Sequence, residues 1–377
     1  MKLISYLNYI PVTLFILFHI AAGDLPAANE TVYFTRLSKP DSSVYSLFNL
    51  QNRYRKVIDL SGSRWNYRLE GDSIWKRISV PHSLPISAKL RFKSYFVPDS
   101  SFSGRVFKLL LFGINYHSRI YVNGVALGEH HGGGSTFSLL IPSNLIKINQ
   151  KNLLEIEVDN FLDWRSTIPL KREIWGWKNY GGILRDIFIA GLPPRWIDGV
   201  KLDYSFFNEY SDIHLNLKIT TGKGDISPGY SDKSRNSKLK KDKFTLQYAI
   251  FDLESKELKY WTRELPVNFE EKDEIVLSDT LKDIELWSPA DPRLYSLVIY
   301  LKRNGVTIDS YQITTGFREI KVQKSEIYLN GSRMKIRGIL KYEDYKYEGA
   351  SAGYNSMESD VKKIRRAGFN TVYFPVP

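Results

Sequence analysis

Cysteine is absent from the 377 residues of this chain. A chain without cysteine has no disulfides, no catalytic thiolate and no zinc site with sulfur ligands. Its stability must therefore come from packing. A hydrophobic content of 43% and an aromatic content of 14% are enough for two or three domains, each with its own core.

Long apolar runs are also missing, except at the N-terminus. Residues 1–23 place Lys2 before an apolar stretch that ends on small residues of the kind that signal peptidases accept. This pattern predicts a signal peptide on an exported chain, periplasmic or extracellular. The alternative is an uncleaved membrane anchor, because Ile4 to Gly23 is roughly long enough to span a bilayer, although Asn8 and Pro11 disfavour it.

The formal net charge is +12 at pH 7, but the basic residues are dispersed. Because a leader would take the chain away from nucleic acid, we expect no nucleic-acid partner. One dense cluster of lysines and arginine lies between Lys218 and Lys243, in a stretch rich in Gly, Ser and Asp. We interpret it as a solvated loop; the alternative is attraction to an anionic polysaccharide or lipid surface.

Helical periodicity is absent from residues 31–190, where short alternating runs are separated by turn residues. RVFKLLLFGI, SRIYVNG and NLLEIEVDN are typical runs, and Asn123-Gly124 is a strong two-residue hairpin signal. We predict one mainly β domain over 31–195, a jelly-roll sandwich.

A linker with two prolines, residues 191–199, leads to a second series of strand-like runs. Their number and spacing predict another β-sandwich over 196–318. After Gly316 the pattern changes. Asn330-Gly331 predicts a last hairpin, and MKIRGIL is an apolar run of the fully buried kind.

The last part of the chain, 319–377, contains one helical pattern between two strand-like runs. NSMESDVKKIRRAGFN has Ser356 or Asn355 as the candidate N-cap and Gly368 as the stop signal, and TVYFPV follows as a strand. Strand, helix and strand make one βαβ unit, which needs a parallel sheet covered on both faces.

Seven stretches now occur in an order that resembles glycoside hydrolase family 2, which includes β-galactosidases, β-glucuronidases and β-mannosidases. They are RVFKLLLFGINYHSRIYVNGVALGEHHGG, LLEIEVDN, WKNYGGILRDIFI, LWSPADPRLYSLVIYL, TTGFREIKV, IYLNGSRMKIRGILKYED and DVKKIRRAGFNTV. The resemblance implies a sugar-binding jelly roll, an immunoglobulin-like sandwich and the truncated start of a (β/α)8 catalytic barrel. It also implies a retaining β-glycosidase without a cofactor.

The chemistry that the resemblance implies needs two carboxyl groups about 5 Å apart, one as acid/base and one as nucleophile. In the family these are glutamates on the fourth and seventh barrel strands, so we expect residues 1–377 to contain no catalytic residue and to be inactive alone. Glu343 and Asp344 follow MKIRGIL at the active face of a barrel, but neighbours on a strand point to opposite faces and cannot act as a pair. We expect Glu348 to be a surface-loop carboxylate.

Several positions depart from the family pattern, and all of them are sugar contacts in it. Leu340 and Tyr342 stand where the family has asparagine and histidine, Gly176 where it has aspartate, and Tyr373 where it has arginine. Only Glu343 keeps the pattern at the first strand end. The departures predict an altered or lost sugar subsite.

The candidate substrate-binding residues are therefore Glu343, Asp344, Tyr342, Trp177 and Asn179. Trp177 and Asn179 lie in a loop of the first domain that is crowded with aromatic residues, which can pack on sugar rings. The alternative for these aromatics is an ordinary place in the core.

Three histidines, His117, His130 and His131, invite a metal interpretation. Two are adjacent and diverge on a strand, and no carboxylate spacing completes a site, so the sequence predicts no metal site. Three functions stay open: the N-terminal portion of an exported glycosidase, a secreted carbohydrate-binding or interaction module, and an anchored structural protein whose basic loop meets an anionic surface.

Overall fold

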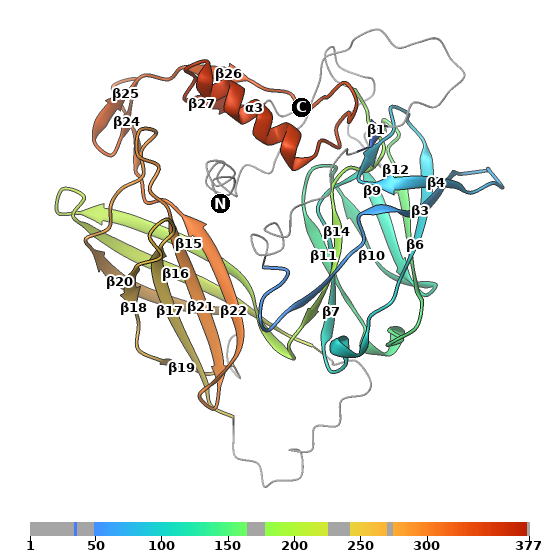
Figure 1. Cartoon of the computed structure of the whole chain (residues 1–377), viewed down its shortest axis with the longest axis horizontal. Coiled ribbons are helices and arrows are strands. Elements are labelled where there is room, and N and C mark those ends of the chain that lie inside the picture. The colour runs from blue at the N-terminus through green and yellow to red at the C-terminus, as the bar shows by residue number, and fades with distance from the viewer. Residues whose placement is uncertain (1–33, 36–48, 164–177, 225–241, 270–273, 375–377) are drawn as a thin grey trace.

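The computed structural model describes residues 34–35, 49–163, 178–224, 242–269 and 274–374. Within them the chain forms two β-sandwiches followed by a small hairpin sheet and one helix between two strands. Figure 1 shows the sandwiches side by side, with the C-terminal segment, in red, beyond one end of them. The predicted leader, residues 1–23, lies outside the described residues.

The first sandwich packs a six-stranded antiparallel sheet against a four-stranded one. The first sheet has the order β10 (Val125–His131), β9 (His117–Val122), β12 (Asn152–Asp159), β6 (Lys89–Phe96), β3 (Gly62–Leu69), β4 (Lys76–Val80). The second has the order β11 (Phe137–Ile141), β7 (Val106–Leu111), β14 (Ile187–Leu192), β2 (Lys56–Asp59). Short ladders join β1 (Phe34–Thr35) to β5 (His82–Ser83) and β8 (Ile114–Asn115) to β13 (Gly182–Ile183), and Ser100–Phe102 and Ser143–Leu145 form 3-10 turns.

The core of this sandwich follows from the period of two in its strands. Every second residue of β6 and of β12 is buried, as expected for strands with one face on a core. Trp65, Phe92 and Phe107 are fully buried among the aliphatic residues of both sheets. The prediction of a mainly β sandwich here is confirmed.

The second sandwich packs three strands against five. The three-stranded sheet has the order β15 (Arg195–Phe207), β16 (Asp212–Lys223), β20 (Glu274–Lys282). The other has the order β18 (Leu258–Trp261), β17 (Phe244–Asp252), β21 (Tyr295–Arg303), β22 (Val306–Thr315), with β19 (Leu265–Val267) also on β17. Tyr248, Tyr295 and Phe317 fill its separate core. Whether this sandwich is immunoglobulin-like stays a prediction, as do the domain limits.

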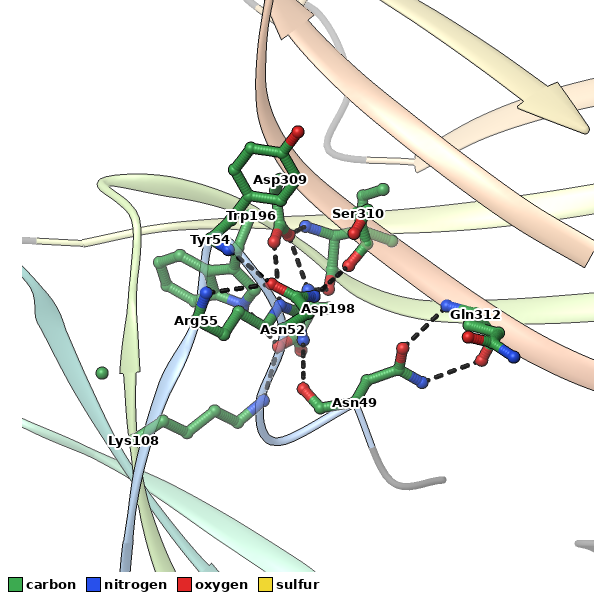
Figure 2. Close-up of polar contacts among 12 residues, drawn as sticks. Asn49, Asn52, Tyr54, Arg55, Lys108, Trp196, Asp198, Asp309, Ser310 and Gln312 are labelled. Atoms are coloured by element: carbon green, nitrogen blue, oxygen red, sulfur yellow. Dashed lines mark hydrogen bonds and ion pairs between the residues drawn. The ribbon is translucent and has the colours of Figure 1, made fainter. Parts of the chain in front are cut away.

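A buried polar junction joins the two sandwiches (Figure 2). The Arg55 guanidinium donates to both carboxylate oxygens of Asp309 on β22, at 2.8 and 2.6 Å, and also to the Ile197 carbonyl at 2.6 Å. The two side chains are only 6% and 0% exposed. Asn49 and Gln312 add a pair of hydrogen bonds of 2.9 and 2.7 Å beside them.

The last part of the chain begins with a three-stranded sheet of β23 (Ile320–Gln323), β24 (Glu326–Leu329) and β25 (Ser332–Met334). The predicted hairpin turn is confirmed, because Asn330 and Gly331 join β24 to β25 with φ of 49° and 75°. β26 (Gly338–Leu340), α3 (Tyr354–Arg366) and β27 (Thr371–Tyr373) follow, and β26 pairs in parallel with β27. The βαβ unit is therefore present, while the barrel that it would start stays a prediction.

Two details of this unit differ from expectation. The helix begins at Tyr354 with Gly353 as N-cap, so the predicted caps Asn355 and Ser356 lie inside its first turn. The predicted burial of the first strand is not observed either, since Gly338 and Leu340 are exposed. β26 has a single partner strand among the described residues, so an apolar sequence alone does not bury it.

Candidate functional site

The candidate residues after β26 lie against one end of the first sandwich. Glu343 pairs with Arg185, Asp344 accepts a hydrogen bond from Tyr180, and the Glu348 carbonyl accepts one from Ser83. Because all three partners come from the first sandwich, the segment after the first βαβ strand is fixed by a domain far earlier in the sequence.

Glu343 forms a partly buried ion pair. Its Oε2 lies 2.6 Å from Nη2 of Arg185, with side chains 17% and 14% exposed. Arg185 also donates to the Ala350 carbonyl at 2.5 Å, so its guanidinium bridges two points of the loop. Through this ion pair Glu343 anchors the loop after β26 to the first sandwich.

Asp344 uses a different partner. The Tyr180 hydroxyl donates to Oδ1 of Asp344 at 2.7 Å. Burial, and after it the hydrogen bond to Asp344, raise the pKa of Tyr180 well above its usual value, so the phenol keeps its proton and remains a donor. Each of the two adjacent carboxylates thus has its own partner, and their role toward a sugar stays a prediction.

A third polar cluster connects the loop to α3. Lys341 Nζ lies 2.8 Å from both the Tyr345 hydroxyl and Oδ2 of Asp360, and Tyr345 donates to the same Oδ2 at 2.9 Å. Burial alone would raise the pKa of Asp360, but the hydrogen bond and charge of Lys341 lower it below its usual range. Lys341 and Asp360 therefore form a charged contact inside the βαβ unit.

The expectation for Glu348 is wrong, because this residue is buried and not on the surface, at 3% exposure. Its Oε1 accepts the Gly353 backbone N–H at 3.1 Å and its Oε2 accepts the Ser356 hydroxyl at 2.5 Å. Both donors lie at the start of α3, where free N–H groups and the helix dipole favour a negative charge. Glu348 caps the helix across a loop, which a local N-cap rule does not detect.

Asn179 is also buried, at 2% exposure. Its amide donates to Ser87 Oγ at 2.8 Å and to the Asn160 carbonyl at 2.7 Å, and Asn115 donates to the following carbonyl, that of Tyr180. This residue therefore holds together the segments around residues 87 and 160, which lie between strands of the first sandwich.

The same close packing explains why the two residues after Tyr180 are glycines. A Cβ on Gly182 would lie 2.6 Å from Nε2 of His82, and its φ is +117°. A Cβ on Gly181 would lie 2.7 Å from the Asn160 amide nitrogen. The Asn-Tyr-Gly-Gly motif is thus explained by close packing in this sandwich.

The exposed residues at the strand ends are apolar or aromatic. Leu340 and Tyr373 are register partners at the carboxyl ends of β26 and β27, 49% and 61% exposed, and Tyr342 is 37% exposed. The three positions that depart from the family pattern at these strands therefore lie at one end of the same small sheet. Such a surface offers rings and methyl groups where amide, imidazole and guanidinium groups were expected.

Trp177, with Trp164 and Trp175, lies outside the described residues, so the predicted aromatic platform stays a prediction. The basic stretch between Lys218 and Lys243 lies mostly outside them too. No helix among the described residues is long and apolar enough to cross a membrane.

The arrangement of His117, His130 and His131 agrees with the sequence-based expectation in one respect and differs from it in another. His130 and His131 do diverge, since His130 stacks on Phe137 while His131 stacks on His117. The premise that no carboxylate completes a group is wrong: one ligand atom each of His117, Glu129 and His131 lie within 4.8 Å of one another. The cross-strand pairing of β9 and β10, not spacing along the chain, brings them together.

Comparison with known proteins gives a consistent result. Residues 197–318 match the family model "Glycosyl hydrolases family 2". The chain is 27% identical over 259 residues to a β-galactosidase of Thermoanaerobacterium thermosulfurigenes, covering 67% of this chain and 33% of that protein. It is 23% identical over 374 residues to a β-glucuronidase of Paenibacillus borealis, covering 87% of this chain and 57% of that protein.

Solved structures show the same fold. A Ruminococcus gnavus β-glucuronidase superposes with a TM-score of 0.70 at 19% identity, over 86% of this chain and 55% of that one. A β-D-glucuronidase of Dictyoglomus thermophilum superposes with a TM-score of 0.69 at 23% identity, over 86% and 55%. The chain spans only about a third of the length of the first curated relatives that it matches, between 33% and 35%.

Proposed function

Because this chain belongs to glycoside hydrolase family 2, we propose that residues 1–377 are the N-terminal, non-catalytic portion of an exported enzyme that hydrolyses O-glycosyl bonds. The substrate would be a β-glycoside, as the names of the β-galactosidase and β-glucuronidase relatives suggest. In this proposal the two sandwiches support a barrel whose first βαβ unit is formed by β26, α3 and β27, and whose later strands supply the acid/base and the nucleophile.

One observation carries the proposal that this portion has no hydrolytic activity of its own. The carboxylates at the strand end are already paired: Glu343 with Arg185, Asp344 with Tyr180, and Glu348 with the start of α3. A retaining glycosidase needs one carboxylic acid that gives up a proton and one carboxylate free to attack. None of the three meets either requirement, since each has a fixed partner from another element.

A direct assay tests this proposal. The 377-residue polypeptide, purified from a host without its own β-galactosidase or β-glucuronidase, should release no nitrophenol from nitrophenyl β-galactoside or β-glucuronide. Circular dichroism and a cooperative thermal transition would establish that the protein assayed is folded. Turnover by this folded polypeptide would contradict the proposal.

A second candidate function, a secreted carbohydrate-binding module, is supported by the exposed rings of Tyr342 and Tyr373 at one end of the β26–β27 sheet. Aromatic faces pack against the C–H faces of sugars. A glycan array would test it, with Trp177→Ala and Tyr373→Ala as the variants. Specific glycan binding without hydrolysis, lost in either variant, would favour this candidate. The glycosidase proposal with an altered subsite predicts the opposite result: titration calorimetry should show no micromolar binding of galactose or glucuronic acid.

A further inference from the structure

The hairpin of β9 and β10 carries a group of side chains that plays no part in the proposed glycosidase function. His117, Arg119 and Tyr121 of β9 alternate with buried residues and so share the outer face of the six-stranded sheet. His131 lies directly opposite His117, and Glu129 directly opposite Arg119. Two imidazoles and a carboxylate therefore gather at one end of this hairpin.

A β-bulge decides which histidines meet. The Asn123-Gly124 turn pairs Val122 with Val125, and without an irregularity the same count would place His130 opposite His117. The register shifts between Ala126 and Gly128, however, and this brings His131 to that place instead. His130 then faces the other side of the sheet, where it stacks on Phe137 with ring centroids 4.0 Å apart.

The three ligand groups lie close together. The rings of His117 and His131 stack with centroids 4.0 Å apart and an angle of 6° between their planes, and Nε2 of His117 is 3.2 Å from Oε2 of Glu129. One ligand atom of each residue lies within 4.8 Å of the other two. In a tetrahedral zinc site with bonds of about 2.0–2.1 Å, ligand atoms are roughly 3.4 Å apart, so a movement on the order of 1 Å would close this group around an ion.

The side chains that must move are the accessible ones. Glu129 and His131 are exposed, while His117 is half-buried and supplies the fixed point. The nitrogen lone pairs of two stacked rings lie in parallel planes and do not converge on one point, so one imidazole has to turn before both can bind one ion. His131 is exposed and has the room to do so. Arg119 competes for Glu129 with a 3.2 Å hydrogen bond to Oε2, whereas Oε1 makes no hydrogen bond to any described residue.

We propose that His117, Glu129 and His131 form a surface site for a divalent transition-metal ion, with water completing the coordination. Two imidazoles and a carboxylate are a recognised ligand set for zinc, and imidazole also suits copper and nickel. Magnesium and calcium would be rejected, because they prefer oxygen ligands and the site offers two nitrogens for one carboxylate. The site is independent of the glycosidase proposal, since none of its three residues takes part in that proposal and it needs no barrel.

Titration of Zn²⁺ into the tag-free 377-residue protein, followed by calorimetry, tests the proposal. The expected result is one Zn²⁺ ion bound per chain. The affinity for Zn²⁺ should fall about tenfold or more in His117→Ala, His131→Ala and Glu129→Gln. Mg²⁺ should give no heat of binding. His130→Ala is the matched control, because the adjacent imidazole points to the opposite face; it should bind Zn²⁺ within twofold of the unaltered protein.

Electron paramagnetic resonance with Cu²⁺ gives a readout that loss of stability would not imitate. The unaltered protein should show coupling of the copper to two imidazole nitrogens, and His131→Ala should show coupling to one. Two results would overturn the site: absence of stoichiometric Zn²⁺ binding by folded protein, or equal losses in His130→Ala and His131→Ala. Either would leave the His117–His131 pair as cross-strand packing with no ligand.

Discussion

Arg55 of the first sandwich and Asp309 of the second form a bidentate ion pair, with N–O distances of 2.6 and 2.8 Å. Both side chains are almost completely buried. Arg55 lies just before β2 in the first sandwich and Asp309 lies on β22 in the second. The same Asp309 accepts the Ile197 backbone N–H at 2.8 Å, so one carboxylate binds both Arg55 of the first sandwich and the start of β15 in the second.

Asp309→Asn should destabilise the protein strongly. A buried guanidinium without its counter-charge typically costs about 3–5 kcal/mol, because the desolvation of the charge is no longer offset. Urea unfolding monitored by fluorescence would measure this as a lower midpoint. Asp203→Asn is the control: its pair with Lys201 is exposed on both sides, and such pairs contribute at most about 1 kcal/mol. Equal effects of the two substitutions would contradict the role given to Asp309.

Glu343→Gln should loosen the βαβ unit from the first sandwich. The substitution removes the charge that Arg185 binds while keeping nearly the same shape, and charged hydrogen bonds contribute about 1.5–3 kcal/mol. Hydrogen exchange should accelerate in residues 343–353, with smaller changes in the sandwiches. Tyr342→Phe is the matched control, since the Tyr342 hydroxyl makes no hydrogen bond to any described residue; unchanged exchange in Glu343→Gln would argue against the anchor.

His82 should make the protein acid-sensitive. The side chain is fully buried, and burial lowers its pKa from 6.5 to about 3, so the folded protein keeps it neutral while the unfolded chain binds a proton below about pH 6.5. Stability contributed in this way is present above pH 6.5 and is lost as pH falls from 6.5 toward 3. At pH 4.5 the loss is about 2–3 kcal/mol relative to pH 7.

Chemical denaturation of His82→Asn at several pH values checks this account of the acid sensitivity. The variant starts from lower stability at pH 7, but the fall between pH 6.5 and 4.5 should become shallower than in the unaltered protein. His214→Asn, at an exposed position on β16, should keep the steep fall. A parallel fall in His82→Asn and the unaltered protein would exclude His82 as the cause.

Gly182→Ala should destabilise the first sandwich by about 2–4 kcal/mol. Two effects add: the positive φ of +117°, and a new methyl group 2.6 Å from Nε2 of His82. Gly124→Ala isolates the backbone effect, because φ is +82° there and nothing lies within 4 Å of the new Cβ. Its cost should be about 1–2 kcal/mol, and thermal unfolding of the two variants should show the difference.

The sequence predicted the elements well where a local signal determines them. Alternating burial in β6 and β12 follows from period-two patterns, and the Asn330-Gly331 turn follows from residues that tolerate positive φ. The burial of Glu348 could not be predicted in this way. Its role depends on a helix start five residues away and on Ser83 from the first sandwich, contacts that no local pattern contains.

For the candidate site, the sequence predicted the place of the residues along the chain but not their partners, and their role toward a sugar stays a prediction. The sequence places Glu343, Asp344 and Tyr342 directly after a strand end, and they are there. Arg185 pairs with Glu343, and Tyr180 donates a hydrogen bond to Asp344. Both contacts depend on how the first sandwich packs against the βαβ unit. Packing between domains is set by three-dimensional complementarity, so it is not visible in the spacing of residues.

The histidine group shows most directly what each level decides. The sequence by itself determined the hairpin, because Asn123 and Gly124 accept the left-handed backbone of a tight turn, and it determined that His130 and His131 point to opposite faces. Only the tertiary structure decided that His131 meets His117 beside Glu129. That choice depends on one extra residue in β10, and a shift of one residue exchanges the two faces of a strand.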